Sequence, residues 1–64
     1  MKKSLAEAIE RGLEYSKKFP ETTVYVMDKP RQHAAVHTSE WVYREKILAG
    51  WHTVKKFLNG QEVK

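Results

Sequence analysis

Apolar and polar positions first alternate with the period of an α-helix, over residues 4–18. The apolar and small residues of this stretch recur at spacings of three and four, so a helix gathers them on one side. Ser4 and Glu7 have the spacing of a capping box, and Pro20 stops the helix shortly after residue 18. The stripe consists of Leu5, Ala8, Ile9, Gly12, Leu13 and Ser16. The pattern predicts an amphipathic helix that packs along this stripe.

The next two stretches predict a β-hairpin. Residues 22–27 are dense in β-branched and aromatic residues, which favour strands. A turn around Pro30 follows, because proline fixes φ and cannot donate a hydrogen bond to a neighbouring strand. Residues 33–37 then return antiparallel to the first strand. The expected register places Met27 opposite Ala34 and Tyr25 opposite Val36.

A second helix is predicted for residues 39–49. Ser39 is its N-cap, and Gly50 is the residue type that commonly follows the last turn of a helix. The apolar residues of this helix cover a broad arc, which is wider than one buried stripe requires. An alternative extends the helix backwards over residues 33–37, with Asp28 as its cap. We favour the hairpin for that stretch because Ser39 is the better cap.

A third strand is predicted for residues 51–58, where β-branched and aromatic residues recur. Asn59-Gly60 follows, and this dipeptide is the strongest short signal for a β-hairpin. Residues 61–63 either pair briefly after that turn or fray.

The predicted fold is a small α+β domain in the order α-β-β-α-β. Two helices pack on an antiparallel sheet of about three strands. The length of 64 residues allows a single domain, 1–64, and such a chain buries only ~60% of its unfolded surface. Residues 1–3 and 61–64 are the ends where fraying is expected.

The composition narrows the class of protein. With 41% hydrophobic and 31% charged residues, the chain is typical of a folded domain, and it has no cysteine for disulfides or thiolate metal sites. No apolar run reaches the ~20 residues of a membrane-spanning helix, and the first residues lack the apolar core of a signal peptide. We therefore expect a cytoplasmic protein without a membrane partner. The net charge of +4 gives a mild attraction to anionic partners.

Candidate catalytic and metal-binding residues are few. His33 and His37 stand four residues apart, which on a helix would put both on one face as zinc ligands. On the favoured strand the same spacing separates them by ~13 Å, too far to share a metal ion. His52 adds no recognised metal motif to these two. The three glycines are isolated from one another, so they form no phosphate-binding loop. We expect a protein that is not an enzyme and that uses no metal, no cofactor and no small-molecule ligand.

Two functions fit the remaining side chains. Aromatic anchors beside arginine are typical of protein interfaces, which favours a protein-interaction module, an adaptor, regulator or inhibitor of a larger assembly. Its partner is another protein or a second copy of the chain, as a homodimer. The predicted partner-binding residues are Trp41, Tyr43, Arg44, Trp51, Lys55 and Lys56.

The alternative function is nucleic-acid binding. Basic residues beside aromatic ones contact phosphates and stack on bases, and they gather around the first hairpin loop and along residues 41–57. The residues predicted for this alternative are Lys29, Arg31, His33, Arg44, Lys46, Lys55 and Lys56.

Overall fold

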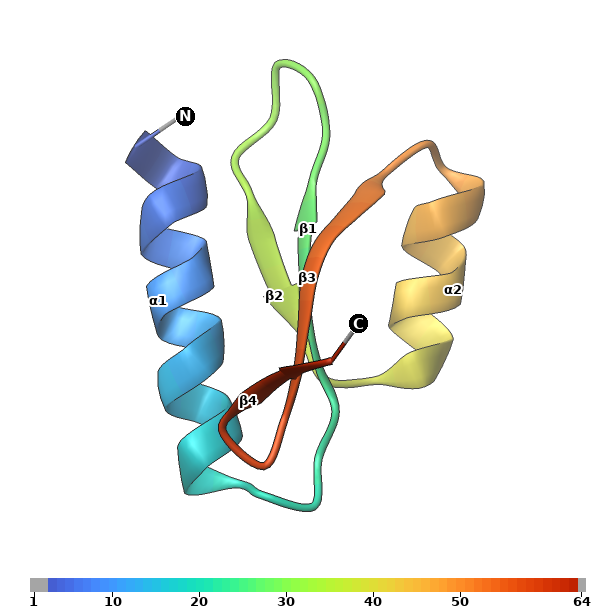
Figure 1. The fold of residues 1–64 in the computed structure, drawn as a ribbon. Coiled ribbons are helices and arrows are strands. Elements are labelled where there is room, and N and C mark those ends of the chain that lie inside the picture. Colours follow the sequence, from blue (N-terminus) through green and yellow to red (C-terminus); the bar gives the residue numbers. More distant parts are fainter. Residues whose placement is uncertain (1–2, 64) are drawn as a thin grey trace.

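The computed structural model describes residues 3–63, and it holds two helices and four strands (Figure 1). The strands form one antiparallel sheet in the order β2-β1-β3-β4. The elements are α1 (Lys3–Lys18), β1 (Val24–Asp28), β2 (Ala35–His37), α2 (Glu40–Leu48), β3 (His52–Leu58) and β4 (Gln61–Val63). The predicted α+β fold and the order α-β-β-α-β are confirmed, and residues 61–63 add a fourth strand to the expected three.

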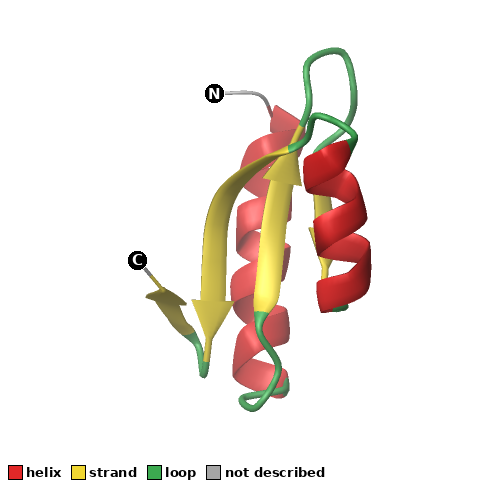
Figure 2. Cartoon of the chain, turned by 90° about the vertical axis from the view of Figure 1, so that its right-hand side faces the viewer, coloured by secondary structure: helices red, strands yellow, loops and turns green. Residues whose placement is uncertain are grey.

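The two helices cover opposite faces of the sheet. Figures 1 and 2 show α1 on one side of the strands and α2 on the other. No helix within residues 3–63 is long and apolar enough to cross a membrane. Of the ends expected to fray, Lys3 begins α1 and 61–63 form β4, while residues 1, 2 and 64 lie outside the described part of the chain.

The apolar core lies between α1 and the sheet. Alternate residues of β1, Val24 and Val26, point to this side, and Phe57 of β3 pairs with Val24 there. Ala8 of α1 completes the fully buried cluster, around which partly buried side chains of α1 and β2 pack. Gly12 brings α1 close to the sheet, because a Cβ atom at this position would lie 2.7 Å from Cγ2 of Val26. The predicted stripe of α1 is therefore the face that meets the core.

Ser4 of α1 does not have its predicted role, and Ser16 adds a polar contact to its predicted place in the stripe. Helix α1 already includes Lys3, so Ser4 lies inside its first turn and does not cap it. Ser16 belongs to the stripe but forms a polar contact there, since its buried hydroxyl accepts a 2.9 Å hydrogen bond from the backbone N–H of Gly60. This bond ties the end of α1 to the β3–β4 turn. The turn itself matches the prediction, with positive φ at Asn59 and Gly60.

The predicted register of the first hairpin is wrong by one residue. Met27 pairs with Ala35 and Tyr25 with His37, because the connecting loop runs to residue 34 and is longer than expected. A shift of one residue exchanges the faces of a strand. In the observed register Val36 pairs with Val26, so both valines face the core beneath α1. Packing of the partly buried Val36 against this core thus accounts for the register that forms.

Helix α2 has the ends that the sequence predicts. The hydroxyl of Ser39 accepts a hydrogen bond from the N–H of Val42, and Gly50 has a φ of 96° just beyond the last turn. A further contact was not predicted: Nζ of Lys29, in the β1–β2 loop, donates a 2.8 Å hydrogen bond to the carbonyl oxygen of Ala49. The positive charge of Lys29 also suits the negative end of the helix dipole.

Candidate functional site

The outer face of α2 exposes two large apolar side chains. The outer face is formed by four residues whose positions along the chain differ by three, one and three, and a helix places residues at these intervals on one side. Trp41 is 73% exposed and Leu48 is 89% exposed, with both apolar side chains on the same side of the helix. None of the residues of α2 is buried. The outer face consists of Trp41, Arg44, Glu45 and Leu48.

This exposure follows from the way in which the chain distributes its apolar residues. A surface helix normally keeps its apolar side chains on one side and polar ones on the other. Helix α2 has apolar or aromatic residues on both sides: Val42 and Tyr43 turn towards the sheet and are half-buried, whereas Trp41 and Leu48 turn outwards. One side of α2 lies over the face of the sheet where Tyr25 and Met27 of β1 are buried, and its other side, which carries the second set, is left exposed.

A shallow hollow lies along this face. Its volume is about 330 Å³, and it is lined by all four residues of the outer face. A neighbouring hollow of about 230 Å³ lies between Glu40, Trp41 and Arg44. The indole of Trp41 therefore borders both hollows, so a side chain from another molecule can lie against either side of it.

The two charges of the outer face differ in their surroundings. Nη2 of Arg44 lies 3.1 Å from Oε1 of Glu40, one turn earlier on the same helix, and both side chains are largely exposed. Such an exposed pair contributes only ~0.3–0.5 kcal/mol. Glu45 forms no ion pair with any residue in the described range 3–63. Between its two apolar side chains, the face thus presents one carboxylate and those N–H groups of one guanidinium that do not bind Glu40.

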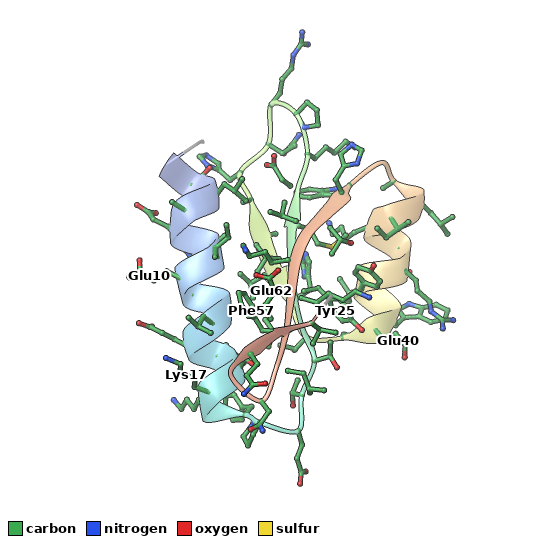
Figure 3. All side chains as sticks on the ribbon, viewed as in Figure 1. Glu10, Lys17, Tyr25, Glu40, Phe57 and Glu62 are labelled. Carbon is green, nitrogen blue, oxygen red and sulfur yellow. The ribbon has the colours of Figure 1, made fainter. Side chains whose placement is uncertain are left out.

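The inner side of α2 carries an aromatic cluster. The rings of Tyr25 and Tyr43 stack with centroids 3.9 Å apart, and the hydroxyl of Thr53 donates a 3.0 Å hydrogen bond to that of Tyr43. Nζ of Lys56 lies 5.8 and 5.7 Å from the two ring centroids. Figure 3 shows Tyr25 on the side of the sheet that faces α2 and Phe57 on the side that faces α1. The cluster attaches α2 to the sheet.

The predicted partner-binding residues are not all on one surface. Trp41 and Arg44 lie on the outer face of α2, whereas Tyr43 and Lys56 belong to the aromatic cluster on its inner side. Trp51, the residue before β3, is half-buried, with Nζ of Lys46 5.2 Å from its ring centroid. Lys55 faces the side of α1 and forms a 2.7 Å ion pair with Glu62.

Sequence reasoning missed Glu45 and Leu48 as members of the same surface as Trp41. The spacing of positions 41, 44, 45 and 48 was available as a signal, because residues at these intervals share one side of a helix. What the sequence left open was which side of α2 meets the sheet.

The residues predicted for nucleic-acid binding are spread over the molecule. Arg31 and His33 are exposed in the β1–β2 loop, which projects beyond the strands at the top of Figure 1. Lys29, from the same loop, is bound to the end of α2. Lys46 and Lys56 lie over aromatic rings on one side of the sheet, and Arg44 and Lys55 are paired with carboxylates elsewhere. The structure therefore brings these seven residues into no single basic patch.

His37 of β2 is a partly buried base whose charge is disfavoured. Burial, and to a smaller extent the positive charge of Lys46, lowers the pKa of His37 below its usual value of 6.5. Its Nε2 is buried without a hydrogen-bond partner among the described residues. Among residues 3–63 no three His, Cys, Asp or Glu side chains are grouped so that they hold a metal ion.

We expect the lowered pKa of His37 to make the protein less stable in mild acid. His37 takes up a proton near pH 6.5 in the unfolded chain and only at lower pH in the folded chain. Its effect on the free energy of unfolding is therefore absent above pH 6.5, and the folded state loses stability as the pH falls below that value. Urea unfolding at pH 8, 7, 6 and 5 measures this decline. His37→Gln reduces it, and His33→Gln, in the exposed loop, does not. Equal curves for wild type and His37→Gln contradict the expectation.

Comparison with known proteins gives no match for this chain among family models, curated proteins or solved structures.

Proposed function

We propose that this chain is a non-enzymatic protein-interaction module and that its partner docks on the outer face of α2. One observation carries the proposal: Trp41 and Leu48, 73% and 89% exposed, lie two turns apart on the same side of a helix that contributes nothing to the buried core. Exposed apolar side chains that form a patch with a polar border are typical of protein interfaces.

The chemistry of the face supports this role. Tryptophan and arginine are the residue types most enriched among interface side chains with large binding contributions. Burying Trp41 or Leu48 beneath a partner removes enough apolar surface to contribute about 2 kcal/mol each. Arg44 and Glu45 add directional contacts between the two apolar anchors. These four side chains suit a partner surface that presents apolar groups flanked by opposite charges.

We expect the double variant Trp41→Ala/Leu48→Ala to lose the partner while keeping the fold. The variant carries an affinity tag and is compared with the tagged wild type in lysate of the native host, after nuclease treatment. At least ten-fold less of each nuclease-resistant partner should be retained, because both anchors are gone. The melting temperature should change by only a few degrees, since substitutions at exposed positions have small effects.

The matched control removes another pair of exposed large apolar side chains. Tyr15 and Phe19 of the α1 end are 44% and 42% exposed, with ring centroids 5.0 Å apart, on the opposite side of the sheet. Tyr15→Ala/Phe19→Ala should retain the partner at the wild-type level. Equal retention by the α2 variant and the wild type would remove the proposal. Partners that disappear on nuclease treatment would instead favour nucleic-acid binding.

A further inference from the structure

The outer face of α2 is complementary to itself when two copies meet head to tail. In an antiparallel pair of helices centred between positions 44 and 45, residue 41 meets residue 48 and residue 44 meets residue 45. The sequence then places Trp41 against Leu48 twice and Arg44 against Glu45 twice. Apolar thus meets apolar and positive meets negative at every contact. This is the property that a two-fold symmetric interface requires.

We propose that the occupant of this face is a second copy of the chain, docked through an antiparallel α2–α2 contact with two-fold symmetry. The inference rests on the proposed function, since it assigns the partner of the same surface. A parallel arrangement is disfavoured by the charges, because it sets Arg44 against Arg44 and Glu45 against Glu45.

The dimensions of the helix fit the contact. Positions 41 and 48 are seven residues apart, which is ~10.5 Å along the helix axis. The two contacts between positions 41 and 48 therefore both fit within the length of α2. Each face carries a hollow of about 330 Å³ lined by Trp41 and Leu48. In the antiparallel pair the indole of one copy lies over the hollow beside Leu48 of the other.

The charges of the single chain also favour a second copy. Glu45 forms no ion pair within residues 3–63, although it lies beside an apolar hollow. The guanidinium of Arg44 uses one nitrogen for Glu40, and its remaining N–H donors stay available for a second carboxylate. In the dimer, Arg44 bridges Glu40 of its own chain and Glu45 of the second copy. Each guanidinium and each carboxylate at the centre of the contact then has a partner of opposite charge.

The dimer is expected to be weak. Helix α2 has nine residues, and a contact limited to this face lies at or below the ~1,200 Å² of total surface that stable interfaces bury. We therefore expect a dissociation constant on the order of 10–100 µM, so that the chain exchanges between monomer and dimer at ordinary working concentrations.

Charge reversal at the two central positions tests the arrangement. Sedimentation equilibrium over about 5 µM to 1 mM is run on the wild type, Arg44→Glu, Glu45→Arg and the double variant Arg44→Glu/Glu45→Arg. Each single reversal sets like charges together at both symmetric contacts, so the dissociation constant should rise at least ten-fold. The double variant restores both pairs and should dimerise like the wild type. An equimolar mixture of the two single variants should form heterodimers.

Glu14→Arg serves as the control for the change in net charge. It reverses a charge at an exposed position of α1, away from the contact between copies, and should keep the wild-type dimer. Circular dichroism of every variant establishes that α2 remains helical. A wild type that stays monomeric up to 1 mM overturns the inference. A dimer that is insensitive to both reversals, or a double variant that stays monomeric, overturns it as well.

These outcomes are separable from those of the proposed function. A monomeric wild type whose capture of another protein still depends on Trp41 and Leu48 removes only the second copy as occupant. Capture that is independent of these two residues, together with a monomeric wild type, removes both the proposed function and the inference.

Discussion

Phe57→Ala removes most of the stability of this protein. The side chain is 4% exposed and contacts the side of α1 where Gly12 lies, at the centre of the buried cluster. Truncation of a buried phenylalanine to alanine costs ~3–5 kcal/mol. A chain of 64 residues has a total stability of roughly 3–10 kcal/mol, so the loss is comparable with the whole. Urea unfolding followed by circular dichroism should show a variant that is largely unfolded or unfolds at much lower urea.

The neighbouring residue provides the control. Leu58 is 40% exposed and points to the other side of β3, where α1 does not reach it. Leu58→Ala should lower the free energy of unfolding by less than ~1 kcal/mol, because this substitution removes little buried apolar surface. Similar losses for the two variants would mean that the core does not lie between α1 and the sheet.

Gly12→Ala should destabilise the fold although alanine is the better helix former. Alanine within a helix is favoured over glycine by ~1 kcal/mol. Its Cβ atom, however, would lie 2.7 Å from Cγ2 of Val26, which is fully buried and cannot move away easily. Overpacking of this kind costs ~1–3 kcal/mol. We expect a net loss, and a loss of more than ~3 kcal/mol for Gly12→Leu, both measured by urea unfolding.

The sign of the Gly12→Ala effect should reverse when Val26 is shortened. In the background of Val26→Ala the Cγ2 atom is absent, so the added methyl group fills space and the helix preference of alanine remains. Gly12→Ala is then stabilising relative to Val26→Ala alone. A stabilising effect in the wild-type background as well would show that α1 does not approach the sheet closely at Gly12.

Local signals in the sequence predict the elements well. Ser39 and Gly50 mark the ends of α2, and Asn59-Gly60 marks the last hairpin, because caps and tight turns depend on a few neighbouring residues. The register of the first hairpin was predicted wrongly by one residue, since it depends on packing of Val36 beneath α1, which is far away in sequence. The hydroxyl of Ser16 likewise meets a backbone amide 44 residues later.

The candidate site could be predicted only in part. Trp41 and Arg44 were identified because an aromatic surplus beside a basic residue is visible in the sequence. Tyr43 and Trp51 look equivalent to Trp41 in the sequence, yet Tyr43 stacks on Tyr25 and Trp51 is half-buried. Tertiary contacts decide which ring stays outside. Leu48 was missed because its exposure depends on the orientation of α2 over the sheet.

The attachment of α2 divides the molecule into two halves of unequal local stability. Helix α2 is held by the Tyr25–Tyr43 stack, the Thr53 hydroxyl and the Lys29 hydrogen bond, and it contributes no residue to the buried core. Such a segment opens without global unfolding, so its amide hydrogens exchange with solvent sooner than those of β1. A molecule bound to the outer face adds its binding free energy to this opening step. Binding at the outer face should therefore slow the amide hydrogen exchange of α2, while the exchange rate of α1 and β1 stays unchanged.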